Sequence, residues 1–168
     1  MRKGGGGSYH VRFDPSVRAV LRNGPTSPMK NPKARTVSLD IASRLEMLET
    51  VQAILGHVTA LVGFDEDAAH YMSVAVRESV VNAIKHGNRQ NAKKRVKVSF
   101  VIEPGVLEVA VLDEGPGFDP GRIPDPVADE NLLKTDGRGI FFMRSFMDKV
   151  EYSFPPKGGT LVRLIKRL

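Results

Sequence analysis

The sequence predicts a two-layer α/β sandwich, in which helices cover one face of a mixed, mostly antiparallel sheet. Three observations lead to this fold class. The hydrophobic patterns follow the order strand, two helices, two strands, an irregular segment, one helix and two strands. This order lacks the regular strand–helix alternation that is typical of a parallel sheet. Short turns rich in Pro and Gly join the strands of two consecutive pairs, which indicates antiparallel hairpins.

The chain divides into a basic tail, residues 1–35, and a folded domain, residues 36–168. The length of 168 residues suits one domain with a short appendage. The tail has eight basic residues, one acidic residue and many Gly and Pro without hydrophobic periodicity, so we expect it to be disordered. The domain has 17 basic and 18 acidic residues. The net charge of +6 therefore belongs to the tail, where weak polyanion binding is the alternative to a solvated segment without function.

The composition excludes several kinds of site. The chain has no Cys, which rules out disulfides, thiolate metal sites and a Cys nucleophile. No apolar run approaches the roughly 20 residues that span a bilayer, and the N-terminus has no signal-peptide core. We therefore expect a cytoplasmic protein without a membrane partner and without direct binding of nucleic acid by the domain.

The first half of the domain predicts one strand and two helices. Apolar and polar residues alternate over 36–41, as in a half-buried strand. Residues 45–62 carry apolar side chains at the spacing of an amphipathic helix, and Gly63 is expected to end it. Asp65 has the character of an N-cap for a second helix, which is expected to run to about His86.

The second half predicts two hairpins around an irregular segment. The expected strands are 95–102, 106–112, 150–154 and 160–164. Residues 113–139 are rich in Gly, Pro and Asp, and a segment of this length without secondary structure is usually functional, often as a lid. A short helix over 140–147 follows this segment.

Polar residues form a stripe on the second helix. Glu78 and Asn82 are four residues apart on one face, and His86 continues the stripe. A solvated polar face is the plain alternative. Asn is unfavourable inside a helix, however, because its amide competes for backbone hydrogen bonds. An amide oxygen beside a carboxylate also suits a magnesium ion and a nearby hydroxyl proton.

Two glycines follow a second candidate functional residue, Asp113. A hydrophobic strand ends at Asp113, and Gly115 and Gly117 follow. A strand end with a tight turn is the plain alternative. In a functional interpretation the Asp113 carboxylate accepts a hydrogen bond from the amino group of adenine, and the glycines let a flat ring approach the backbone.

Two more glycine motifs precede the last elements. Gly137-Arg138-Gly139 begins a helix, where free backbone N–H groups bind anions. The pattern is neither a Walker loop nor a dinucleotide fingerprint. Gly159-Thr160 opens the last strand, and taken alone it indicates a hairpin turn.

Together these motifs resemble those of the Bergerat-fold (GHKL) ATPases, which include gyrase, histidine kinases and bacterial anti-sigma-factor serine kinases. The resemblance covers residues 36–168, with the motifs in the family's order. The run from Gly137 to Tyr152 is most similar to the anti-sigma-factor serine/threonine kinases of sporulation and stress-response switches. The matching motifs are Glu78-x-x-x-Asn82-Ala-Ile-x-His86-Gly87, Asp113-x-Gly115-x-Gly117-Phe118, Gly137-x-Gly139 and Gly159-Thr160.

The resemblance implies a role for each matched residue. Glu78 would be the general base, Asn82 would hold Mg²⁺ on the phosphates of ATP, and Asp113 would bind the adenine amino group. Thr160 would support Asp113, and His86 would either contact phosphate or support a residue that does. The remaining nucleotide-binding residues would be Gly115, Gly117, Gly137, Arg138 and Gly139, with residues 119–136 as the lid.

The resemblance also implies a function. The chain would be a homodimeric, ATP-binding anti-sigma factor that sequesters a sigma factor and phosphorylates a serine on an anti-sigma-factor antagonist of the STAS type. The alternative is a non-catalytic module that uses ATP only to shape its partner-binding surface. Glu78 favours the kinase, because a pure binding module has no need of a base.

Overall fold

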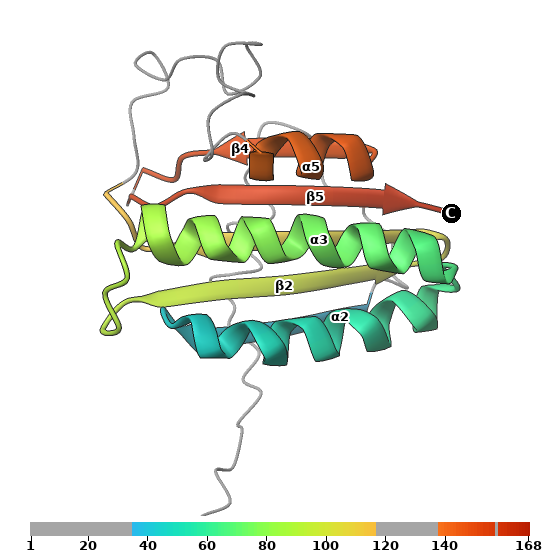
Figure 1. Cartoon of the computed structure of the whole chain (residues 1–168), viewed down its shortest axis with the longest axis horizontal. Coiled ribbons are helices and arrows are strands. Elements are labelled where there is room, and N and C mark those ends of the chain that lie inside the picture. Colours follow the sequence, from blue (N-terminus) through green and yellow to red (C-terminus); the bar gives the residue numbers. More distant parts are fainter. Residues whose placement is uncertain (1–34, 117–137, 157) are drawn as a thin grey trace, which may run out of the picture.

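One sheet and one layer of helices make up the described part of the chain, which is residues 35–116, 138–156 and 158–168 of a computed structural model (Figure 1). The strands are β1 (Arg35–Ala42), β2 (Arg95–Glu103), β3 (Val106–Asp113), β4 (Lys149–Ser153) and β5 (Leu161–Arg167). The helices are α2 (Leu48–Val62), α3 (Glu66–Asn82) and α5 (Arg138–Phe146), with a 3₁₀ turn η1 (Leu45–Met47) and a π-helical turn η2 (Ala83–Gly87). The predicted two-layer α/β sandwich is confirmed.

The sheet has the strand order β1-β2-β3-β5-β4, which places β3 at its centre. All four pairings between these described strands are antiparallel, so no parallel pair of the expected mixed sheet occurs among them. Strand β3 ends at Asp113, and its neighbour β5 begins just after Thr160, whose carbonyl accepts the N–H of Asp113 at 3.1 Å. This topology brings two segments that are far apart in the sequence to the same end of the sheet.

The predicted helix ends agree with the structure. Gly63 caps α2 in the left-handed conformation, with a φ of 97°, which glycine adopts without steric cost. Asp65 caps α3, and its side chain accepts a hydrogen bond from the N–H of Ala68 at 2.7 Å. Strand β1 begins at Arg35, one residue earlier than predicted. Residues 1–34 and 117–137 lie outside the described residues, so the disordered tail and the lid stay predictions.

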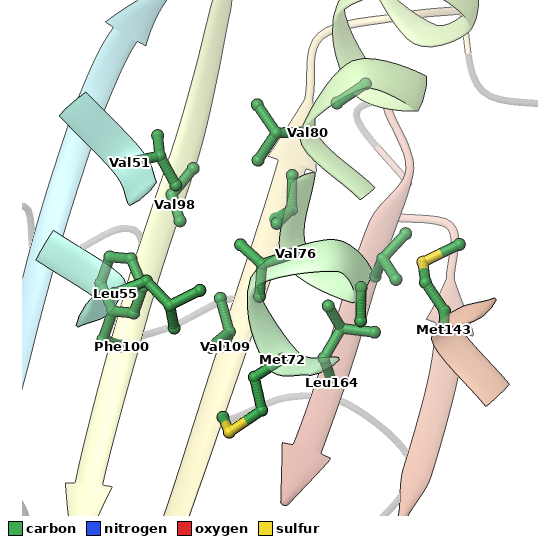
Figure 2. Close-up of a cluster of buried hydrophobic side chains, with 14 of the residues drawn as sticks. Val51, Leu55, Met72, Val76, Val80, Val98, Phe100, Val109, Met143 and Leu164 are labelled. Carbon is green, nitrogen blue, oxygen red and sulfur yellow. The ribbon is translucent and has the colours of Figure 1, made fainter. Parts of the chain in front are cut away.

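The core lies between the sheet and the helices (Figure 2). Val76 and Val80 of α3 point toward the sheet, with Val76 near Val109 of the central strand, and all three side chains are fully buried. Each buried side chain of this size stabilises the fold by about 1.5–3 kcal/mol. The other labelled core residues are Val51, Leu55, Met72, Val98, Phe100, Met143 and Leu164. The core therefore fixes α3, which carries Glu78 and Asn82, against β3, which ends at Asp113.

An ionic network joins three strands on the sheet face opposite the helices. The Arg163 guanidinium donates to both carboxylate oxygens of Glu108, at 2.9 and 2.7 Å, and to Glu151 at 3.2 Å. Hydrogen bonds to the Glu108 carboxylate raise the pKa of Arg163 above its ordinary value. A bidentate pair of this kind is geometrically specific, so it supports the register of β3 and β5.

Within the described part of the chain, one helical stretch, Leu45–Val62, is long and apolar enough to cross a membrane by length and composition alone. It carries Val51, Leu55 and Val58, which are buried in the core. A helix that covers a sheet has the same composition, so the stretch is weak support for a membrane span.

Gly56 offers a test of the helix assignment. It lies in the middle of α2, and a Cβ atom there would meet no other atom within 4 Å. Because Ala loses less backbone entropy than Gly, Gly56→Ala is expected to raise the free energy of unfolding by about 0.5–1 kcal/mol in urea titrations. Gly63→Ala is the matched control. It also enters open space, but the positive φ of Gly63 makes it destabilising. Equal shifts from the two variants would contradict the assigned helix end.

Candidate functional site

Two carboxylates mark the ends of an elongated site along α3 and η2. At one end, a Cβ atom on Gly139 would lie 2.6 Å from Oε2 of Glu78, so α5 begins directly against this carboxylate. At the other end, a Cβ atom on Gly87 would clash with the carboxylate of Asp113. Gly87 is nine positions after Glu78, which corresponds to about 13 Å of helix. Asn82 lies between the two ends and is half-buried.

The helix changes its hydrogen bonding at the Asp113 end. In η2 the N–H of Asn88 donates to the carbonyl of Ala83 at 2.8 Å, five residues earlier. The sequence predicts that this helix runs to about His86, and the helical run does continue to Gly87, but α3 ends at Asn82 and the last turn is π-helical. Single π-helical turns occur frequently at functional sites. Here the turn ends with Gly87 against Asp113, and His86 within it is exposed.

Asp113 is a buried carboxylate held by backbone amides. The residue is only 5% exposed to solvent. Its Oδ1 accepts hydrogen bonds from the N–H groups of Gly115 at 2.8 Å and Thr160 at 3.1 Å. Burial raises the pKa of Asp113 above its ordinary value of 3.8, although the amide hydrogen bonds and the positive charge of Lys94 act in the opposite direction. A carboxylate whose pKa is perturbed in this way indicates a functional site.

Glycines allow three backbone segments to meet around Asp113. The N–H of Gly159 donates to the carbonyl of Gly115 at 2.9 Å. A Cβ atom on Gly115 would clash with the carbonyl of Gly87, and one on Gly159 would clash with the carbonyl of Asp113. Gly159 also has a φ of 90°, which disfavours any other residue. Gly159 is therefore part of the wall behind Asp113 as well as of the turn that the sequence predicts.

Asn88 is a site residue that sequence reasoning missed. It is 1% exposed, and its side chain joins two strands: Nδ2 donates to the carbonyl of Arg95 at 2.8 Å, and Oδ1 accepts the N–H of Glu114 at 2.8 Å. Its only signal in the sequence is its place after the glycine that ends the helix. Nothing there pairs it with Glu114, which is 26 residues away.

Part of the predicted site lies outside the described residues. This holds for Gly117, Gly137, residues 119–136 and the side chain of Arg138. Gly139 is buried at the start of α5, and Thr160 is buried beside Asp113. The structure thus brings Glu78 to Gly139, and Asp113 to Gly87, Gly115 and Thr160, as two groups.

The described residues contain no cluster of three or more His, Asp or Glu that could hold a metal ion by themselves. A magnesium ion that bridges nucleotide phosphates keeps several waters and needs only one or two protein oxygens. The amide oxygen of Asn82, one helical turn from Glu78, fits this kind of site.

Comparisons with known proteins agree with the fold and with the motifs. Residues 41–166 match the model of the histidine kinase-like ATPase domain family. The chain is similar to the anti-sigma F factor of Bacillus subtilis, with 34% identity over 99 residues, which are 58% of this chain and 68% of that protein. It is also similar to the serine-protein kinase RsbW of Bacillus subtilis, with 27% identity over 130 residues, which are 73% of this chain and 79% of that protein.

A solved structure shows the same fold. It contains the RsbU and RsbW domains of a protein from Mycobacterium tuberculosis, with a TM-score of 0.58 and 20% identity. The similarity covers 80% of this chain and 32% of that chain. At this identity it supports the fold and not the chemistry.

Proposed function

Because the chain belongs to the family of histidine kinase-like ATPase domains, we propose that it is an ATP-binding anti-sigma factor that phosphorylates a serine on a STAS-type antagonist. One observation carries the proposal: an amide-held carboxylate, Asp113, and a second carboxylate, Glu78, lie at the two ends of one helical stretch with Asn82 between them. The relatives named anti-sigma F factor and serine-protein kinase support the same function.

In the proposal, Asp113 recognises adenine. The amides of Gly115 and Thr160 use part of the acceptor capacity of its carboxylate, which has about four lone-pair sites. A remaining lone pair would accept a hydrogen bond from the amino group of adenine. Guanine offers a carbonyl oxygen at the corresponding position, which would leave the buried carboxylate unpaired. The site is therefore expected to prefer ATP to GTP.

At the other end, Glu78 serves the transfer of phosphate. The carboxylate takes the proton of the serine hydroxyl while the serine oxygen forms a bond to the γ-phosphorus of ATP. The bond from that phosphorus to the oxygen bridging to the β-phosphate breaks, and ADP leaves. Asn82 would hold Mg²⁺, which neutralises phosphate charge when bound. Gly139 lies beside Glu78 in the first turn of α5, so backbone amides that could bind phosphate lie next to the proposed base.

The remaining parts of the proposal are a sigma-factor partner, a homodimer and a cytoplasmic location. All three follow from the resemblance to anti-sigma-factor kinases. A pull-down with the full chain from its source organism, with and without ATP and Mg²⁺, tests the partners. Recovery of a sigma factor and a STAS protein, one of them dependent on ATP, is the expected result. Recovery of neither protein would contradict the proposal.

The raised pKa of Asp113 predicts a pH dependence of nucleoside binding. Adenosine is the suitable probe, because it lacks phosphates that titrate. Adenosine affinity is expected to fall as the pH is lowered from neutral through the raised pKa of Asp113, because protonation removes the charge that accepts the adenine amino group. Calorimetric titrations between pH 4.5 and 7.5 measure the change, at pH values where circular dichroism reports the folded state. A constant affinity down through the pH at which the Asp113 carboxyl becomes protonated would remove the ionised Asp113 carboxylate from adenine recognition.

A further inference from the structure

Asn88 joins three segments that meet at the Asp113 end of the site. Its backbone N–H closes the π-helical turn, its Nδ2 binds the first residue of β2, and its Oδ1 binds the residue that follows β3. One partner is a carbonyl and the other is an N–H group, so the side chain must both donate and accept. A primary amide meets this need, whereas an aliphatic or carboxylate side chain does not. The residue is nearly inaccessible to solvent.

The hydrogen bond between Asn88 and Glu114 stands next to the contact that shapes the proposed adenine site. Gly87, which precedes Asn88, lies against the carboxylate of Asp113, which precedes Glu114. The two chain segments are therefore joined one residue beyond the point where they touch. A second hydrogen bond holds the start of β2 against Glu114, because the N–H of Arg95 donates to Oε2 of Glu114 at 2.9 Å.

We propose that Asn88 is a positioning residue for nucleotide selection: it holds the end of β3 against the end of η2, so that Asp113 stays where it accepts the amino group of adenine. The inference rests on the proposed ATP-binding function. Asn88 acts through Glu114 and makes no contact with the nucleotide itself. Its loss leaves the N–H of Glu114 and the carbonyl of Arg95 without their partner. Because unpaired buried polar groups are costly, these segments are then expected to shift so that both groups reach water.

Substitution by an aliphatic residue of similar size tests the proposal in the full chain. Asn88→Leu is expected to weaken ATP binding about tenfold, a usual result when a buried hydrogen-bonding side chain is removed. The preference for ATP over GTP is expected to fall as well. In the phosphoryl-transfer reaction, KM for ATP rises while kcat stays near the wild-type value, because Glu78 lies at the opposite end of the site.

Two controls separate positioning from general stability. Asn91→Ala removes an exposed side-chain amide from the same loop, whose oxygen accepts the N–H of Lys93, and it is expected to leave ATP binding unchanged. Val58→Ala removes part of a buried side chain of α2, a helix that contributes no residue to the candidate site, and so lowers stability away from it. If Val58→Ala weakens ATP binding as much as Asn88→Leu does at the same loss of Tm, the positioning role is overturned.

Asn88→Asp keeps an acceptor for the N–H of Glu114 but loses the donor to the carbonyl of Arg95. It is expected to retain more of the ATP-over-GTP preference than Asn88→Leu, and it serves as the test variant if the Leu variant does not fold. Wild-type ATP affinity and nucleotide preference in a folded Asn88 variant would overturn the inference alone. Absence of ATP binding by the wild-type chain would instead overturn the proposed function on which the inference rests.

Discussion

Asp113→Asn is expected to weaken ATP binding by about 100-fold or more. The substitution removes a hydrogen bond from the adenine amino group to a charged acceptor, and it places a second donor opposite that amino group. The amide oxygen of Asn can still accept from Gly115 and Thr160, so the local backbone is retained. The amide nitrogen, however, presents hydrogen atoms to the adenine amino group, which is itself a donor. Calorimetric titration of ATP at pH 7.5 measures the loss.

In the absence of nucleotide, the Asp113→Asn variant is expected to be at least as stable as the wild type at neutral pH. Burial raises the pKa of Asp113 in the folded state above the unfolded value of about 3.8. The folded state therefore binds the proton more tightly, and this contribution to stability is present below the unfolded pKa and is lost as the pH rises through the folded pKa. An Asn side chain does not titrate, so the variant does not lose stability in this way as the pH rises. Urea unfolding at pH 4.5 and pH 7.5 should show a larger gain for Asp113→Asn at pH 7.5.

Glu114→Gln is the matched control for this prediction. It changes an exposed carboxylate next to Asp113, and its amide oxygen can still accept the N–H of Arg95. Its ATP affinity should stay within about twofold of the wild type, as expected for an exposed position. Unaltered ATP affinity in Asp113→Asn would remove the carboxylate from adenine recognition.

Glu78→Gln is expected to slow phosphoryl transfer by about 10²- to 10⁴-fold, the usual contribution of a general base. Gln has nearly the size of Glu and fits the same half-buried place against Gly139, but it cannot take the proton of a serine hydroxyl. ATP affinity should change little, because Asp113, the proposed adenine-binding group, lies at the other end of the site. Single-turnover transfer from radiolabelled ATP measures the rate, and titration measures the affinity.

Glu66→Gln, in the exposed first turn of the same helix, controls for the loss of one negative charge. It is expected to transfer phosphate at the wild-type rate. A Glu78→Gln variant with unchanged transfer would exclude Glu78 as the base. Loss of ATP binding together with transfer would instead make Glu78 a nucleotide-holding residue.

The local features of the fold could be predicted from the sequence, because each depends on a short segment. The period of the apolar residues predicts α2 and α3, and the caps at Gly63 and Asp65 follow from residue preferences that the structure bears out. The strand pairs β2–β3 and β4–β5 follow from their short turns. The fold class then follows from the order of these elements.

The arrangement around Asp113 could be predicted only in part, since it depends on contacts between distant segments. The motifs indicate Asp113 and Thr160, but the hydrogen bond between them spans 47 residues, and no periodicity encodes it. The π-helical turn escaped prediction because it differs from an α-helix by a single hydrogen-bond shift. The role of Gly87 also appears only when the position of the Asp113 carboxylate is known.

The most direct test of the proposed function uses the full chain, ATP, Mg²⁺ and the STAS protein recovered with it from the source organism. The account predicts that one serine of the STAS protein becomes phosphorylated, that an equal amount of ADP forms, and that both products form about 10²- to 10⁴-fold more slowly with Glu78→Gln. A wild-type chain that binds ATP and the STAS protein but forms no phosphoserine would contradict the kinase and favour a non-catalytic, ATP-dependent binding module.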